Sequence, residues 1–290
     1  MNEHFIKNIE IKNFKCFDNF KAEGFGRVNL IGGKNNVGKT AFMEAVYINT
    51  SNEDLKAIIR DIIISRYFAD IFVDLFLDVG KKFIENFIQE KSKDYINSQI
   101  ESNLKNLRVN TIFKNNNKAR KQGYEFYYSL IIENELEDKF DSYLQEFDNT
   151  IKKFRIINSQ PFCKKNDKFY SLNEFGDGLG KFISFIISLL SQRNSIILID
   201  EIENGIHYTN LDKLWETILT ISKQQNVQVF ATTHSKECIE SYARVAKKLE
   251  DEEIAFIELC KREDKIKAFV YPYDWFIDEI EQEHEVRGCL

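Results

Sequence analysis

One short segment limits the folds open to this chain more than any other. Residues 33–40 read Gly-Lys-Asn-Asn-Val-Gly-Lys-Thr, which matches the pattern G-x-x-x-x-G-K-[ST] in full. A predicted strand, 27–31, leads into it and a helical pattern, 40–48, follows it, which is the context that this loop requires. Its glycines allow successive backbone N–H groups to turn inward and hold phosphate oxygens at a helix N-terminus.

The chemistry of this loop gives its last two residues distinct roles. We expect Lys39 to bridge the β- and γ-phosphates of a nucleotide and Thr40 to bind Mg²⁺ through its hydroxyl. The alternative, a surface turn that happens to contain lysine, is disfavoured by the strand–loop–helix context. The residues predicted to bind nucleotide here are Gly33, Lys34, Asn35, Asn36, Val37, Gly38, Lys39 and Thr40.

Strand and helix patterns alternate in the C-terminal part of the chain, which predicts an α/β fold with a mainly parallel sheet flanked by helices. Predicted strands at 27–31, 195–200 and 227–232 combine with predicted helices at 177–191, 209–223 and 235–249. The other predicted elements are strands at 5–11, 16–20, 107–113, 124–132, 254–259 and 266–271, a mostly helical stretch at 51–106, and helices at 135–154 and 275–285.

Polar side chains follow two of the apolar strands. Asp200 and Glu201 end one strand, and Thr233-His234-Ser235 follows another. Because ligands bind at the carboxyl ends of parallel strands, we expect these groups beside the phosphate loop. Asp200 suits Mg²⁺ binding, Glu201 suits a general base for an attacking water, and His234 suits polarisation of the γ-phosphate. The alternative for the last segment is a helix capped by Ser235 with an incidental histidine.

A second glycine-rich loop opens the predicted helix at 177–191. It reads Phe175-Gly-Asp-Gly-Leu-Gly-Lys181 and offers a second helix N-terminus to phosphate. One phosphate needs only one such loop, so the second is useful if it reaches the nucleotide of a neighbouring subunit. The alternative is a tight turn capped by Asp177. The candidate binding residues are Gly176, Asp177, Gly178 and Lys181.

The order of these motifs (GKNNVGKT, FGDGLGK, IILIDE, TTHS) resembles that of the ABC-type ATPases of the recombination and chromosome-maintenance group, which includes RecF- and SMC-like proteins. The stand-alone AAA-family ATPases related to the overcoming-lysogenisation-defect (OLD) proteins are especially similar. The opening IEIKNFKCFDNF also resembles the first two strands of that group. The resemblance covers roughly residues 1–50 and 155–290.

The resemblance implies one ABC-type P-loop ATPase head over residues 1–290. Its N-terminal lobe, 1–50, would contain antiparallel strands and the Walker A motif. Residues 51–154 would form an α+β insert of helices and a β-hairpin. Residues 155–290 would form the lobe with the signature loop, the Walker B motif and the switch histidine.

The resemblance also implies site roles and an assembly. Gly33 to Thr40 would be Walker A, Asp200 and Glu201 Walker B, His234 the switch histidine and 203–207 the D-loop. Two ATP molecules would lie between the subunits of a head-to-tail homodimer, or within a higher homo-oligomer, with residues 176–181 as the signature loop acting in trans.

The chain departs from the family pattern in three places. The signature loop lacks the serine of the usual LSGGQ form, so Asp177 or Lys181 would take its place on the γ-phosphate. Gln89 is the one candidate for a Q-loop glutamine. No TOPRIM nuclease domain follows His234, so we expect such an effector to be a separate protein.

Composition and charge exclude several classes of protein. The longest nearly apolar run, 182–190, is far shorter than the roughly 20 residues that cross a bilayer, and the N-terminus has no signal pattern. Five widely spaced cysteines without a CxxC pair favour free thiols in a reducing compartment. We therefore expect a cytoplasmic protein without a membrane partner.

The formal net charge of −6 gives no general attraction to nucleic acid, so such binding would require a local patch. One candidate lies in 103–123, which contains basic residues and no acidic one, and nucleic acid or an acidic protein would suit it. The alternative is the solvated tip of a hairpin. The basic residues are Lys105, Arg108, Lys114, Lys118, Arg120 and Lys121.

These features predict an enzyme that hydrolyses ATP to ADP and phosphate, with ATP and Mg²⁺ as ligands. Lys39, Thr40 and the loop amides would stabilise charge on the phosphoryl group while Glu201 activates water. By resemblance, hydrolysis would gate a dimer coupled to a nuclease, such as a TOPRIM protein, or to another effector in phage defence or DNA maintenance. Two alternatives are a slow or non-hydrolysing scaffold that sequesters a toxic effector, and the ATPase subunit of a transporter.

Overall fold

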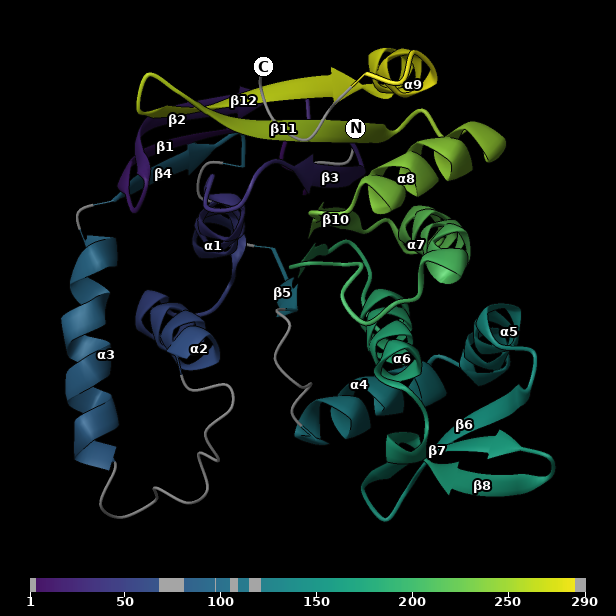
Figure 1. Ribbon diagram of the computed structural model, residues 1–290. Helices are drawn as coiled ribbons and strands as arrows, with labels where there is room; N and C mark the ends of the chain where they lie inside the picture. The colour runs from purple at the N-terminus through teal and green to yellow at the C-terminus, as the bar shows by residue number, and fades with distance from the viewer. Residues whose placement is uncertain (1–3, 68–80, 97, 105–108, 115–120, 285–290) are drawn as a thin grey trace.

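The computed structural model describes residues 4–67, 81–96, 98–104, 109–114 and 121–284. A six-stranded sheet, in the order β12–β11–β3–β10–β9–β5, forms the centre of the molecule (Figure 1). Its strands are parallel except for β12, which pairs antiparallel with β11. The bounds are β3 Val28–Gly32, β5 Thr111–Lys114, β9 Ile196–Ile199, β10 Gln228–Thr232, β11 Ile254–Arg262 and β12 Lys265–Pro272.

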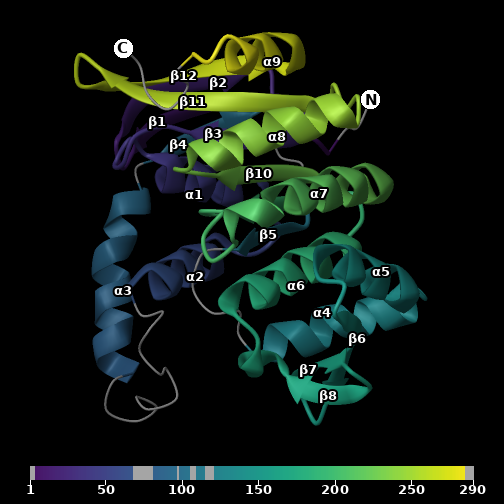
Figure 2. The same cartoon turned by 45° about the vertical axis from the view of Figure 1, so that its right-hand side comes forward.

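Both faces of the sheet are covered, which explains why its inner strands are continuously apolar. Ile197 and Ile199 of β9 point into one core, and Ile196 and Leu198 of the same strand point into the other. Helices α1 and α2 contribute to the second core, and α4 to α9 contribute to the first (Figures 1 and 2). The bounds are α1 Lys39–Thr50, α2 Leu55–Tyr67, α4 Lys121–Glu133, α5 Glu137–Phe147, α6 Asp177–Leu190, α7 Leu211–Gln225, α8 Lys236–Lys248 and α9 Tyr273–Glu281.

The predicted α/β fold with N-terminal antiparallel strands is confirmed. Strands β1, Asn8–Phe14, and β2, Phe17–Glu23, form a hairpin, and β4, Gln99–Ser102, pairs antiparallel with β1. Strand β4 lies in the stretch that we predicted to be mostly helical, so the prediction is wrong there. Helix α3, Lys81–Ile96, precedes it.

The prediction of a hairpin between 107–113 and 124–132 is also wrong. The segment 107–113 overlaps β5, but the segment 124–132 lies within helix α4. The aromatic and β-branched residues of this segment favour strands, yet its buried or packed residues, Tyr124, Tyr128 and Ile131, recur at helical spacing against the core. The insert therefore contributes a strand to the central sheet and a helix to its face.

A third, antiparallel sheet follows α5, where we predicted only helix as far as residue 154. It consists of β6, Ile151–Ile157, β7, Gln160–Lys165, and β8, Lys168–Ser171. The short helix η2, Leu172–Glu174, connects it to α6. Figures 1 and 2 show this sheet at the end of the molecule beyond α4.

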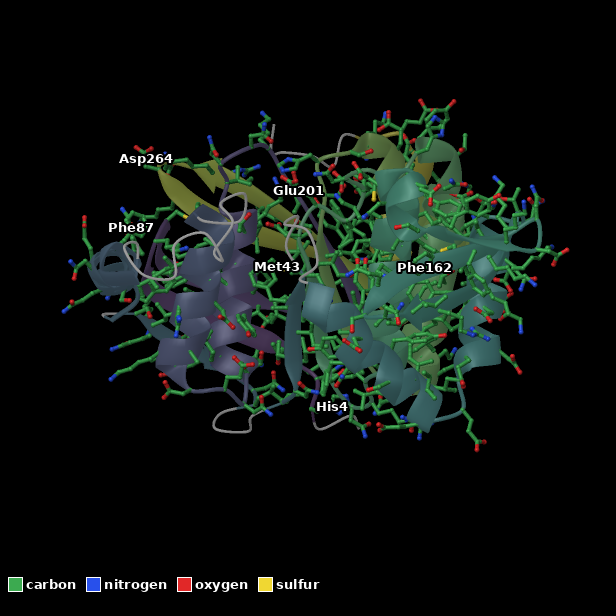
Figure 3. All side chains as sticks on the ribbon, turned by 90° about the horizontal axis from the view of Figure 1, so that it is seen from below. His4, Met43, Phe87, Phe162, Glu201 and Asp264 are labelled. Atoms are coloured by element: carbon green, nitrogen blue, oxygen red, sulfur yellow. The ribbon has the colours of Figure 1, made fainter. Side chains whose placement is uncertain are left out.

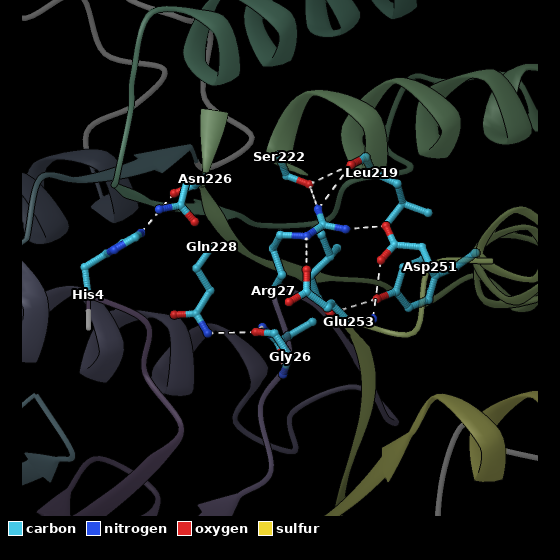
Figure 4. Close-up of polar contacts among 12 residues, drawn as sticks. His4, Gly26, Arg27, Leu219, Ser222, Asn226, Gln228, Asp251 and Glu253 are labelled. Atoms are coloured by element: carbon cyan, nitrogen blue, oxygen red, sulfur yellow. Dashed lines mark hydrogen bonds and ion pairs between the residues drawn. The ribbon is translucent and has the colours of Figure 1, made fainter. Parts of the chain in front are cut away.

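A buried ion pair holds the start of β3 against the C-terminal half of the chain (Figure 4). The Arg27 guanidinium, 2% exposed, donates to the buried carboxylate of Asp251 and to Ser222 Oγ. It also donates to Leu219 O over 3.1 Å and to Glu253 Oε2 over 3.2 Å. Every donor group of the guanidinium thus faces an acceptor, as a buried cation requires.

Asp251→Ala should lower the free energy of unfolding by about 3–5 kcal/mol, because it removes the buried counter-ion of Arg27 and leaves only the exposed carboxylate of Glu253. Urea denaturation followed by circular dichroism measures this loss. Glu281→Ala, which removes an exposed pair with Lys247, is the control and should cost less than about 1 kcal/mol. The double variant Arg27→Met with Asp251→Leu should recover much of the loss. If Asp251→Ala cost no more stability than Glu281→Ala, the buried ion pair would not be important for stability.

The structure bears on two expectations from composition, the lack of a membrane-spanning helix and the free thiols. Within the part of the chain that the structure describes, no helix is both long and apolar enough to cross a membrane. Cys16, Cys163 and Cys238 are not disulfide-bonded. Cys260 is, so the expectation of free thiols is wrong at that position.

Candidate active site

The phosphate loop joins β3 to α1, as predicted, and its glycines are required by its geometry. Gly33 has φ +142°, and a Cβ there would lie 2.4 Å from Leu259 O of β11. Gly38, with φ +92°, is the N-cap residue of α1. Side chains at these two positions would strain the backbone, and at Gly33 one would also strike the main chain of β11. The loop thus depends on a strand more than 200 residues further along the sequence.

The Lys39 ammonium is held inside this loop. Lys39 is buried, and its Nζ donates to Gly33 O over 2.7 Å and to Lys34 O over 2.9 Å. Burial lowers the pKa of Lys39 to about 8, although Asp200, Glu203 and Glu201 act in the opposite direction. A desolvated cation that faces loop carbonyls is well placed to exchange them for phosphate oxygens.

Asp200 lies between the phosphate loop and β10. Its Oδ2 accepts a hydrogen bond from Thr40 Oγ1 over 3.1 Å, and its Oδ1 accepts one from Thr232 Oγ1 over 2.5 Å. Burial raises the pKa of Asp200, because the carboxylate is removed from water. A desolvated carboxylate beside a hydroxyl fits Mg²⁺, which takes one or two protein oxygens and completes its shell with substrate phosphate and water.

This site differs from the metal centres that proteins build from their own side chains. The described residues contain no group of three or more His, Cys, Asp and Glu placed to hold a metal. A Mg²⁺ ion at Thr40 and Asp200 would therefore depend on the nucleotide for its remaining ligands.

Glu201 projects from a strained turn at the end of β9 (Figure 3). Its φ of +50° is unusual for a residue with a side chain, and its N–H donates to Thr232 Oγ1 over 2.8 Å. The carboxylate is 41% exposed, and its Oε1 lies 3.8 Å from His234 Nε2. Two of the three predicted catalytic side chains, Glu201 and His234, are thus adjacent, and the carboxylate is open to water; the third is Lys39.

Glu203 fixes the loop that carries His234. Its Oε1 accepts a hydrogen bond from His234 N over 2.7 Å, whereas its Oε2 is buried and has no hydrogen-bond partner among the described residues. We predicted residues 203–207 as a D-loop from the family resemblance, but gave Glu203 no role. We predicted no role for Thr232, whose hydroxyl contacts Asp200 and Glu201 N. The one sequence signal for it is its position directly before Thr233-His234-Ser235, a predicted site.

The second glycine loop lies in the same chain beside the Walker B turn. A Cβ on Gly178 would lie 2.6 Å from Gly205 O, so this glycine is required for close packing within the chain. Burial lowers the pKa of Lys181, and the nearby carboxylates of Asp177, Glu201 and Glu203 act in the opposite direction. A Cβ on Gly176 would meet no atom of the described part of the chain within 4 Å. Asp177 is the first residue of α6 and Gly176 its N-cap, so the alternative of a turn capped by Asp177 is wrong.

Of the six residues in the predicted basic patch, the structure describes two, Lys114 and Lys121. Lys114 ends β5, where burial lowers its pKa to about 8 and its Nζ lies 5.4 Å from the centroid of the Tyr127 ring. Lys114 is therefore a half-buried side chain and not a fully exposed cation. Lys121 begins α4. Lys105, Arg108, Lys118 and Arg120 lie outside the described residues.

Gln89 is exposed within α3, which packs against α2 and contributes no residue to the site. The residue beside Asp200 in the neighbouring strand is Lys114, not Gln89. The Lys114 carbonyl accepts a hydrogen bond from Asp200 N over 2.8 Å. A Q-loop role for Gln89 is therefore not supported by its place in the fold.

Comparison with known proteins agrees with this geometry. Residues 66–240, more than half of the chain, match the family described as "AAA domain, putative AbiEii toxin, Type IV TA system". A Helicobacter pylori protein named ATP/GTP phosphatase is 25% identical, over 95% of this chain and 97% of its own length. An uncharacterised Methanocaldococcus jannaschii protein is 28% identical over 39% of this chain and 52% of its own length.

The fold is similar to that of solved SMC heads. An Smc head bound to the C-terminal winged-helix domain of ScpA superposes with a TM-score of 0.58 at 12% identity, covering 92% of this chain and 98% of that chain. A second Smc head, with an extended coiled coil and a ScpA domain derived from Pyrococcus furiosus, gives a TM-score of 0.50 at 12% identity, covering 96% and 99%. At this identity the likeness shows the fold alone, and it confirms the predicted ABC-type head.

Proposed function

The chain belongs to the AAA-domain family described above, and on this premise we propose that it binds ATP and hydrolyses it to ADP and phosphate. One observation carries the proposal: the phosphate-loop lysine, the Thr40–Asp200 pair and the Glu201–His234 pair meet at the carboxyl ends of β3, β9 and β10. The name of the Helicobacter pylori relative, ATP/GTP phosphatase, supports the same reaction and suggests GTP as a second substrate.

The proposed reaction assigns each residue a task. Lys39 and the N–H groups of the loop bind the phosphates and stabilise the charge that develops on them. Glu201 accepts a proton from the attacking water, and His234 beside it holds the γ-phosphate or the water in line. Thr40 and Asp200 would hold Mg²⁺, which neutralises phosphate charge.

We further propose that ATP closes a head-to-tail homodimer, with Gly176, Asp177, Gly178 and Lys181 reaching the nucleotide of the partner. Gly176 supports this, because no atom of the described residues lies within 4 Å of the place where a Cβ would be. A coupled effector, such as a TOPRIM nuclease, and a role in phage defence or DNA maintenance rest on the family resemblance alone, as does the closer likeness to OLD proteins.

Phosphate release by the purified protein tests the proposed activity. We expect turnover with ATP and Mg²⁺, loss of turnover in EDTA, and restoration by added Mg²⁺. Light scattering of Glu201→Gln tests the dimer, and its mass should double only with ATP and Mg²⁺. Absence of phosphate release despite ATP binding would favour the scaffold that sequesters a toxic effector.

Glu203→Ala should lower kcat about tenfold with little change in KM, because the loop that carries His234 loses a charge-assisted hydrogen bond. Glu203→Gln retains an acceptor oxygen for His234 N and should recover most of the activity. Steady-state phosphate release measures both variants. Equal losses in the alanine and glutamine variants would contradict this positioning role.

A further inference from the structure

The small sheet β6–β7–β8 carries a concentration of positive charge on an acidic protein. Residues 151–171 contain six basic residues and one acidic residue, Asp167, whereas the whole chain has a net charge of −6. The six are Lys152, Lys153, Arg155, Lys164, Lys165 and Lys168. This excess is separate from the segment 103–123 that the sequence first indicated.

Strand pairing arranges these residues into rows. Lys153 lies opposite Lys164, which lies opposite Phe169, and these three form one row across the sheet. The next outward-facing row consists of Arg155, Phe162 and Ser171. Figure 3 places Phe162 on the half of the molecule opposite Phe87 and Asp264.

The two faces of this sheet differ sharply. Phe154 and Cys163, on the inner face, are 0% exposed, and the Phe154 ring packs against Tyr128 of α4 and Phe140 of α5. Alternation along the strands therefore directs the row of Lys153, Lys164 and Phe169 away from the helices. By the same alternation Lys165 and Lys168, which pair at the end of β7 and β8, leave the backbone on the side of Cys163 and lie at the rim of the sheet. We call the outward-facing row, together with Lys152 and this rim, the basic sheet face.

The charges of the basic sheet face are poorly compensated within the described residues. Arg155 pairs with the buried Asp141, and Lys164 pairs with Asp167, which is 95% exposed and so contributes little. The other four lysines make no ion pair with a described carboxylate. Lys153 opposes Lys164 and Lys165 opposes Lys168, and like charges directly opposed across strands destabilise a sheet. An external polyanion would relieve this repulsion.

An exposed aromatic side chain identifies the kind of polyanion. Phe169 is 43% exposed in the same row as two lysines, and Phe162 lies in the neighbouring row, partly exposed. Aromatic rings on an open sheet stack with unpaired bases while nearby cations bind the backbone phosphates. Duplex DNA is a poorer fit, because its bases are stacked inside the helix and cannot stack on Phe169. An acidic protein segment is also a poorer fit, because it would contact the lysines and not the aromatic rings.

We propose that the basic sheet face binds single-stranded nucleic acid, with the lysines on phosphates and Phe169 stacked on a base. The chain leads from Ser171 through η2 into the glycine loop of α6, so this surface adjoins one of the predicted nucleotide-binding segments. The proposal concerns binding only and does not depend on hydrolysis.

Fluorescence anisotropy with a labelled 20-nucleotide single-stranded DNA, a matching RNA and the corresponding duplex tests the proposal. We expect the single strands to bind with a salt slope of about −3, as four to five phosphate contacts give. The variant with Lys152, Lys153, Lys165 and Lys168 all replaced by glutamine should bind at least tenfold more weakly and lose most of this slope. Phe169→Ala should weaken single-strand binding about tenfold and leave duplex binding unchanged.

A matched control replaces four exposed lysines elsewhere, Lys236, Lys247, Lys248 and Lys261, by glutamine, and it should bind like the wild type. Phosphate release should be alike in all variants, since none of these residues belongs to the nucleotide site. Thermal melting should show that every variant is folded, and the variant of the basic sheet face should melt no lower than the wild type, because it removes opposed like charges. Absence of single-strand binding at low salt, or equal binding by the two fourfold variants, would overturn the proposal. Competition by polyglutamate as strong as that by the oligonucleotide would overturn it in favour of an acidic protein partner.

Discussion

Replacing Glu201 by glutamine is expected to lower kcat for ATP hydrolysis by about 10²–10⁴-fold, the range that a general base contributes. Glutamine has nearly the same shape as glutamate but cannot accept the proton of the attacking water. The main-chain bond from Glu201 N to Thr232 Oγ1 does not involve the side chain, so the turn should remain in place. Because the phosphates are bound by other groups, KM should change little.

Glu240→Gln provides the matched control. Glu240 has the same side-chain exposure as Glu201, 41%, and likewise faces a basic group, Lys236. It lies on the surface of α8, so its replacement should leave kcat within about twofold of the wild type. Single-turnover phosphate release separates chemistry from product release; a Glu201→Gln enzyme with wild-type turnover would remove Glu201 from the proposed mechanism.

Replacing Lys39 by methionine should abolish the tight binding of ATP. Methionine has a similar length and apolar stem but no charge, so two charge-assisted contacts to phosphate are lost. At about 1.5–3 kcal/mol for each contact, the Kd for ATP should rise by roughly 10²–10⁴-fold. Equilibrium binding of a fluorescent ATP analogue measures this change without any need for turnover.

The fold of the Lys39→Met variant should survive. Burial disfavours the charged form of Lys39, which lowers its pKa to about 8, so removal of the charge does not cost the protein a strong internal ion pair. Lys248→Met, at an exposed position of α8, is the control and should bind ATP normally. Loss of ATP binding together with an unchanged melting temperature is the expected pattern; retained binding would mean that the nucleotide lies elsewhere.

Patterns that extend over a few neighbouring residues were predicted correctly. The loop at 33–40, the strand before Asp200 and the helix that begins near Asp177 all agree with the structure. Each depends on local properties: positive φ at Gly38, a continuous apolar run in a strand covered on both faces, and a periodic helical stripe. Such properties can be predicted from the residues themselves.

Elements that depend on distant partners were not predicted. Strand β4 has little apolar pattern of its own and forms through pairing with β1, about 90 residues earlier. The segment of α4 has the composition of a strand, and its helical form is decided by packing on α5, α6 and the small sheet. The strands β6 to β8 were missed for the same reason, because their inner face is completed by helices.

The sequence by itself determined the chemistry that is available: a phosphate loop, two carboxylates at the end of an apolar strand, and a histidine after the next. Only the tertiary structure decided which of these groups meet. Thr40 and Asp200, 160 residues apart in the sequence, form a hydrogen bond. The Thr232 hydroxyl bonds to both Asp200 and Glu201 N. Glu203 accepts a hydrogen bond from His234 N. The physical reason is that local sterics and burial leave a pattern in neighbouring residues, whereas a hydrogen bond between strands exists only after the sheet has formed.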